Sequence, residues 1–118
     1  MPRKDRGEAS YLADMLSFAR EVLTFTQGRS RADYESDTRL RRSVERSTEL
    51  IGEAASNISD ATRAAHPEIP WRKIIGQRNV LIHDYGDVDD DLVWNLVELE
   101  IPKLASILEG IVTKDVTE

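Results

Sequence analysis

Four side chains that could do chemistry lie within one eight-residue stretch: Arg78, Asn79, His83 and Tyr85. The arginine guanidinium can hold a phosphate group through two parallel N–H donors. The histidine can exchange a proton near neutral pH. The asparagine can orient the imidazole or a substrate, and the tyrosine adds a phenolic hydroxyl. Residue types in this combination indicate phosphate chemistry that needs no metal ion.

One histidine does not easily act as both acid and base when a phosphodiester is cleaved. A two-fold symmetric dimer would bring two copies of Arg78 and His83 to one cleft. We therefore expect a composite site that both subunits form. This expectation comes from the chemistry and not from the residue spacing.

The same residues also have purely structural interpretations. Arg78 could pair with a buried glutamate, and His83 could stabilise the C-terminal end of a helix, where a cation suits the helix dipole. On the Arg-x4-His spacing alone the structural interpretation is favoured. His66, which lies beside Pro67, is interpreted as structural in the same way.

Charged residues cluster in two further places. Arginines gather between residues 39 and 46, where a solvated helix face is favoured over an RNA-binding patch; they are Arg39, Arg41, Arg42 and Arg46. Aspartates gather between residues 87 and 91, where capping of a following helix is favoured over a cation site; they are Asp87, Asp89, Asp90 and Asp91. The net charge of -6 weighs against non-specific nucleic-acid binding but does not exclude a local basic patch.

Apolar residues recur every three or four positions in two long segments, which predicts helices over residues 8–27 and 37–58. The first stripe comprises Tyr11, Leu12, Met15, Leu16, Ala19, Val22 and Leu23, and the second comprises Leu40, Val44, Ile51, Ala55 and Ile58. Gly28 is expected to end the first helix. The polar residues 29–36 are expected to form a loop.

Prolines divide the second half of the chain. Residues 59–66 predict one or two helical turns, which end at residues 67–70 because this segment holds two prolines. A third helix is expected from residue 71 to near residue 83. A fourth is expected from the aspartates to residue 111, with an interruption at Pro102. The polar residues from 113 onward are expected to fray.

The 118 residues fit one domain, with a core over about residues 8–112 and a polar tail over residues 113–118. No strand pattern of period two is present, so the expected fold class is all-α, an up-and-down four-helix bundle. The absence of cysteine excludes a thiolate metal site and a cysteine nucleophile. No membrane span or secretory signal is visible, so a cytoplasmic protein is expected.

The stretch from Arg78 to Tyr85 resembles the Arg-x4-His-x-Tyr signature of HepT toxins, a branch of the HEPN (higher eukaryote and prokaryote nucleotide-binding) domains. Other motifs resemble that family in the same order; they are Asp14-Met15-Leu16, Ile51-Gly52-Glu53-Ala54-Ala55, Pro67-Glu68-Ile69-Pro70-Trp71 and Val88-Asp89-x-Asp91-Leu-Val-Trp94. The resemblance covers roughly Tyr11 to Leu104. Together these motifs are far more specific than Arg-x4-His, and they reverse the preference for a structural interpretation.

This resemblance implies a homodimeric helical bundle with a metal-independent endoribonuclease site, free of cofactors, where two copies of the motif meet. Arg78 and His83 would be catalytic, Asn79 would support them, and the product would carry a 2′,3′-cyclic phosphate. The resemblance also implies the toxin of a type VII-like toxin–antitoxin pair, whose partner is a MntA-type nucleotidyltransferase. That antitoxin would transfer AMP to Tyr85, and the added bulk and negative charge would repel an RNA phosphate.

The alternative function is a non-catalytic HEPN binding module that docks a nucleotidyltransferase and presents nucleotide or substrate to it. Such a module needs the dimer and partner surfaces, but it does not need an intact pair of Arg78 and His83. A third interpretation, a purely structural bundle, predicts that changes at Asn79 and Tyr85 alter only stability.

Overall fold

The computed structural model describes residues 7–76 and 90–117 of the 118-residue chain. All regular secondary structure in these two ranges is helical, which confirms the all-α fold class. In chain order the elements are α1 (Glu8–Thr26), α2 (Arg31–Ser36), α3 (Thr38–Ala55), α4 (Asp60–Ala65), a helical stretch at residues 71–76, α6 (Asp90–Asn95), the π-helix η3 (Leu96–Glu100) and α7 (Ile101–Thr117).

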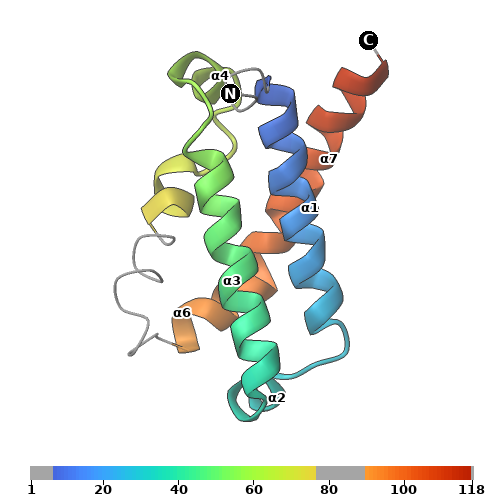
Figure 1. Ribbon diagram of the computed structural model, residues 1–118, viewed down its shortest axis with the longest axis vertical. Helices are drawn as coiled ribbons and strands as arrows, with labels where there is room; N and C mark the ends of the chain where they lie inside the picture. Colours follow the sequence, from blue (N-terminus) through green and yellow to red (C-terminus); the bar gives the residue numbers. More distant parts are fainter. Residues whose placement is uncertain (1–6, 77–89, 118) are drawn as a thin grey trace.

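The long helices α1 and α3 run side by side in opposite directions, and α7 packs along α1 (Figure 1). The short helices α2 and α6 contact each other at one end of the molecule, where α2 also contacts α3. The start of α1, the short helix α4 and the end of α7 lie at the opposite end. None of the helices in the described ranges has both the length and the apolar content of a bilayer span. The up-and-down four-helix topology and the homodimer stay predictions.

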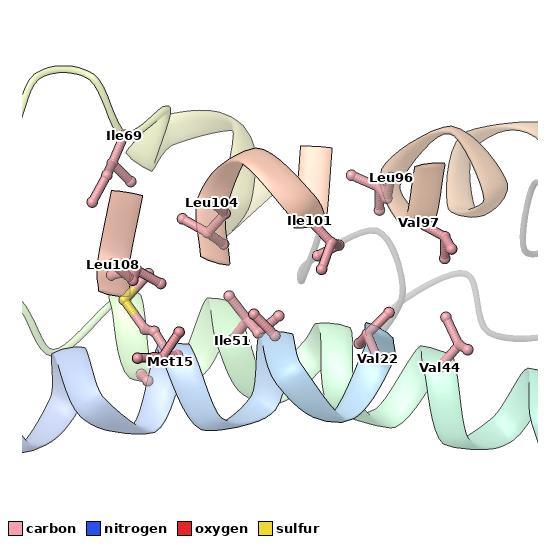
Figure 2. Packing of buried hydrophobic residues seen from close by; sticks show 14 of the residues in the cluster. Met15, Val22, Val44, Ile51, Ile69, Leu96, Val97, Ile101, Leu104 and Leu108 are labelled. Atoms are coloured by element: carbon pink, nitrogen blue, oxygen red, sulfur yellow. The ribbon is translucent and has the colours of Figure 1, made fainter. Parts of the chain in front are cut away.

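The core lies where the apolar stripes of α1, α3 and α7 meet. Figure 2 shows Met15 of α1 beside Leu108 of α7, and Ile51 of α3 and Val22 of α1 on the side of the core that faces Leu104 and Ile101 of α7. Both predicted stripes are buried throughout, apart from Leu23, which packs half-buried against the core. Burial of one large aliphatic side chain contributes about 1.5–3 kcal/mol to the free energy of folding. The apolar contacts between these three helices are therefore the main stabilising interaction among them.

The loop expected over residues 29–36 is wrong, because residues 31–36 form helix α2. A capping box begins this helix. The Ser30 hydroxyl accepts the Asp33 N–H at 3.1 Å, and the Asp33 carboxylate accepts the Ser30 N–H at 2.9 Å. Two polar side chains therefore accept the free backbone N–H groups at the start of this helix. The helix was missed because its sequence has few apolar residues in a repeating pattern. Gly28 follows the end of α1 as expected, with a φ of 72°.

The interruption expected at Pro102 is confirmed, and it lies just before that residue. Over η3 the backbone widens to the π-helical hydrogen-bond pattern, and α7 then begins at Ile101. Proline has no N–H for the preceding turn, so a regular α-helical ladder cannot continue through this point. α7 continues to Thr117, so residues 113–117 extend the last helix, and the fraying expected there stays a prediction. Ile111 and Val112 still pack against the core and support this last turn.

Candidate active site

The four residues expected to carry the chemistry lie outside the residues that the structure describes; they are Arg78, Asn79, His83 and Tyr85. The aspartates Asp87 and Asp89 lie outside them as well. The roles of all six stay predictions. The structure does describe how the chain is held on either side of this stretch, up to residue 76 and again from residue 90.

On the N-terminal side, Trp71 anchors the helical residues 71–76. Its ring is buried, and the indole Nε1 donates a hydrogen bond to the His66 carbonyl at 3.0 Å. Pro70 precedes the helix, and its carbonyl accepts the Ile74 N–H at 3.0 Å. Because the fixed φ of proline suits a first helical turn, the chain enters this helix in a defined direction.

The backbone of His66 has a structural role, and the structural role of its side chain stays a prediction. Its N–H donates to the Arg63 carbonyl at 3.1 Å and ends α4, while its own carbonyl holds Trp71. The imidazole Nδ1 lies 3.8 Å from the Glu68 carboxylate. These contacts lie at the turn between α4 and the helical residues 71–76. They therefore fix the start of the helical residues that precede the motif.

A cavity of about 210 Å³ lies beside residues 71–76. Lys73 and Glu100 contribute to its lining and form an ion pair at 3.0 Å. Much of the remaining lining is aliphatic, including Ile51, Ile74 and Leu104. An apolar group fits such a lining better than a phosphate does, so this cavity is not the expected place of phosphate chemistry.

On the C-terminal side, α2 holds α6. Arg31 forms ion pairs with Asp91 and with Glu35, the second at 2.7 Å, and both carboxylates raise the pKa of Arg31. One turn further along each helix, the rings of Tyr34 and Trp94 are in contact. Helix α6, which directly follows the motif-bearing stretch, is therefore attached to α2 by charge at its first turn and by aromatic packing at Trp94.

A buried polar cluster lies behind this attachment, formed by Tyr34, Arg41, Glu45 and Asp90. Tyr34 is 0% exposed and Glu45 is 8% exposed. Burial raises the pKa of the Tyr34 hydroxyl, the negative charges of Glu45 and Asp90 raise it further, and Arg41 offsets part of this rise. Tyr34 is thus held as a neutral phenol among three charged groups, at the point where α2, α3 and α6 meet.

Comparison with known proteins supplies the family. The family described as Ribonuclease HepT-like matches residues 15–111, which include the whole Arg78–Tyr85 motif. The chain belongs to this family. It is 36% identical over 104 residues to "Probable ribonuclease HepT" of Thermococcus cleftensis, an alignment that covers 88% of this chain and 94% of the relative.

Further relatives carry similar names. The chain is 34% identical to "Putative RNase MJ1380" of Methanocaldococcus jannaschii, over 88% of this chain and 95% of the relative. It is also 34% identical to "Putative RNase TTE0752" of Caldanaerobacter subterraneus subsp. tengcongensis, over 89% of this chain and 94% of the relative. No solved structure matches the chain.

In this HepT-like chain three of the four arginines of α3 are exposed, as predicted, and this exposure fits both a solvated face and an RNA-binding patch; they are Arg39, Arg42 and Arg46. Arg42 pairs with Glu45 at 3.2 Å, and Arg46 pairs with Glu49 at 3.1 Å. Arg39 is exposed, whereas Arg41 is half-buried and belongs to the buried polar cluster. Within the described ranges, no three acidic, histidine or cysteine side chains group closely enough to hold a metal ion.

Sequence reasoning missed the buried polar cluster of this HepT-like chain. Its one local signal is that Glu45 directly follows the buried Val44 and lies four residues after Arg41, so both charged side chains border the apolar stripe. Their partners Tyr34 and Asp90 come from two short helices, and nothing in the local sequence links these positions. The cluster is a property of the tertiary fold.

Proposed function

We propose that this HepT-like chain is a metal-independent endoribonuclease that acts as a homodimer. The observation that carries the proposal is the family match, because it spans residues 15–111 and so includes Arg78, Asn79, His83 and Tyr85. The ribonuclease names of relatives that align over most of their length support it. The firm attachment of the chain on both sides of the motif is what a composite site between two subunits would require.

In the proposed reaction His83 of one subunit accepts the proton of the RNA 2′-hydroxyl. The 2′-oxygen then attacks the adjacent phosphorus, and the bond from phosphorus to the 5′-oxygen breaks. The partner subunit's His83, which begins protonated, gives its proton to the leaving 5′-oxygen. Arg78 stabilises the charge that develops on the phosphoryl oxygens, and Asn79 orients the imidazole or the substrate. The products are a 2′,3′-cyclic phosphate and a 5′-hydroxyl.

We further propose that the chain is the toxin of a type VII-like toxin–antitoxin pair with a MntA-type nucleotidyltransferase. The Tyr85 hydroxyl gives up its proton to solvent and its oxygen attacks the α-phosphorus of ATP in the antitoxin; a phosphodiester to AMP forms, the bond between the α- and β-phosphates breaks, and pyrophosphate leaves. The added phosphate brings negative charge and bulk beside Arg78 and His83. RNA phosphates are then repelled from the site, and cleavage stops.

The decisive experiment is cleavage of total RNA by the purified protein in excess EDTA, with analysis of the product ends. We expect cutting, 2′,3′-cyclic phosphate ends, and loss of cutting in His83→Ala. The matched control is His66→Ala, because Trp71 uses only the backbone carbonyl of His66. Loss of activity on chelation, or full activity in His83→Ala, would contradict the mechanism.

A second measurement separates the enzyme from the binding module. The protein is co-expressed with a MntA-type nucleotidyltransferase, and its mass is compared with that of a Tyr85→Phe variant. AMP-sized additions on Tyr85 together with arrest of growth by the unmodified chain support the toxin. Growth that is unaffected by the unmodified chain, with a stable complex, would instead support a non-catalytic module that docks the nucleotidyltransferase.

A further inference from the structure

An exposed aromatic ring lies beside two arginines at the end of α1. Phe25 is 38% exposed, although most large apolar residues of the described ranges are buried. It lines an open hollow of about 260 Å³ together with Arg29 and Arg39. Proteins that bind single-stranded nucleic acid commonly use an aromatic ring beside guanidinium groups, because the ring stacks on a base and the cations contact phosphates.

The arginines continue from this hollow along the outer side of α3. At 100° per residue, Arg39, Arg42 and Arg46 fall within an arc of about 60° and span roughly 10 Å along the helix. A second hollow, which Arg39 and Arg42 both line, adjoins the first. We call the set Phe25, Arg29, Arg39, Arg42 and Arg46 the Phe25–Arg46 surface.

Free donor groups remain on this surface. The side chains of Arg42 and Arg46 are each 66% exposed, whereas their partners Glu45 and Glu49 are only 11% and 21% exposed. A guanidinium has five N–H donors, so one inward-facing carboxylate leaves donors for a ligand from solvent. Within the described part of the chain, no ion pair engages the Arg39 side chain.

The one carboxylate in the hollow is already engaged. Asp37 caps α3 by accepting the Leu40 N–H at 3.1 Å, and it lies 3.6 Å from Arg29. The surface carries four arginines against three carboxylates, Asp37, Glu45 and Glu49, each paired with one of them, in a chain whose net charge is -6. The positive charge is therefore concentrated locally, which favours a polyanion on this face and not on the rest of the molecule.

The surface also borders the side of α3 that faces the start of α6. Arg41 and Glu45, next to Arg42 on the helix, face Tyr34 and Asp90 in the buried polar cluster. Asp90 is the first described residue after the motif-bearing stretch. A strand that lies across α3 from Phe25 would thus extend toward the point where that stretch joins the fold.

We propose that the Phe25–Arg46 surface binds a single-stranded segment of the RNA substrate. The Phe25 ring stacks on a base, and Arg39, Arg42 and Arg46 contact successive phosphates. This assignment rests on the proposed ribonuclease function, for which it supplies the substrate-binding surface. A second copy of the chain is a poorer occupant, because a two-fold contact would place the arginine row opposite itself.

The test is binding of a fluorescein-labelled oligoadenylate of about 12 nucleotides, a length within the range of single-strand binding sites. Fluorescence anisotropy is measured over a series of KCl concentrations, with every variant built on His83→Ala so that the RNA is not cut. We expect Arg39→Ala to lower the slope of log Kd against log salt by about 0.7, the value for one phosphate contact on a single strand. We expect Phe25→Ala to weaken binding about tenfold and Phe25→Trp to retain it.

The control variant is Arg20→Ala, which removes the same charge from the α1–α7 side, where Arg20 pairs with Glu109 at 2.6 Å. It should leave the salt slope unchanged. Equal slopes for Arg39→Ala and Arg20→Ala, or full binding by Phe25→Ala, would overturn the proposal. So would a change in oligomeric mass of Phe25→Ala, by light scattering, without a change in RNA binding.

Cleavage assays of the same variants with His83 restored separate the two proposals. If the protein cuts no RNA but shows the expected binding pattern, the proposed RNA-binding surface stands and the proposed ribonuclease function is contradicted. If the Phe25→Ala and Arg39→Ala variants cut and bind RNA as well as the unaltered chain, the proposed ribonuclease function stands and the proposed RNA-binding surface is contradicted. Thermal melts of each variant confirm that it is folded.

Discussion

The rings of Tyr34 and Trp94 lie with their centroids 5.6 Å apart and their planes inclined by 37°. Tyr34 belongs to α2 and Trp94 to α6, so this contact joins two short helices that are 60 residues apart in the chain. Tilted aromatic pairs at this separation contribute about 0.5–1.5 kcal/mol beyond the area they bury. The contact therefore fixes α6 close to the place where the proposed catalytic stretch ends.

This packing predicts different costs for the ring and the hydroxyl of Tyr34. The hydroxyl makes no well-formed hydrogen bond within the described part of the chain, although Arg41 lies near enough to lower its pKa, so Tyr34→Phe should change the free energy of unfolding by less than about 1 kcal/mol. Tyr34→Ala removes a fully buried ring and should cost about 3–5 kcal/mol. Urea unfolding of both variants checks this. An equal cost for the two substitutions would show that the hydroxyl has a strong partner.

A second prediction compares two leucines on either side of the η3–α7 junction. Leu108 is 0% exposed and Leu99 is 54% exposed. Leu108→Ala should lower the free energy of unfolding by about 2–5 kcal/mol, because it leaves a cavity between α1 and α7. Leu99→Ala should change it by no more than about 0.5 kcal/mol. If both substitutions were equally costly in chemical denaturation, Leu99 would be covered in solution.

The long helices were predictable because their apolar residues repeat at the helical period. Leu40, Val44 and Ile51 are buried as their spacing predicts, since each position depends only on which side of one helix faces the core. Helix α2 was missed for the same physical reason. Six residues with one buried side chain, Tyr34, hold too little periodic signal, and the capping box at Ser30 is the only local indication.

The motif residues of the candidate site stay predictions, because they lie outside the described residues. The residue types of Arg78 and His83 indicate phosphate chemistry, and the family match supports that reading. The buried polar cluster was not predictable, because Glu45 and Asp90 meet only through the packing of three helices. The exposure of Phe25 was not predictable either, since an aromatic residue at a helix end can equally well face the core.

A third prediction concerns the capping box of α2. The Ser30 hydroxyl accepts the Asp33 N–H at 3.1 Å, so Ser30→Ala leaves that donor without its partner. It should lower the free energy of unfolding by about 1 kcal/mol. Ser17→Ala, at an exposed position within α1, is the matched control and should be neutral or slightly stabilising. Equal effects of the two substitutions in thermal unfolding would contradict a stabilising cap.

The last prediction concerns acid stability and Glu8 of α1. Its carboxylate accepts hydrogen bonds from the Ser59 N–H and, at 2.7 Å, from the Thr62 hydroxyl, and so joins α1 to the start of α4. The Ser59 N–H has the largest effect and Thr62 the next, and together they lower the pKa of Glu8 below its ordinary value of 4.5.

A lowered pKa in the folded state means that the stabilising contribution is fully present above the unfolded-state pKa. It is lost as the pH falls through the folded-state pKa, because the protonated carboxyl is no longer a strong acceptor. The Tm of the unaltered chain should therefore exceed that of Glu8→Gln near neutral pH, and the two should converge as the pH falls toward about 3. Glu53→Gln, at an exposed position on α3, serves as the control and should follow the unaltered chain. A constant difference in Tm between the unaltered chain and Glu8→Gln over the whole pH range would show that the Glu8 charge does not stabilise the junction of α1 and α4.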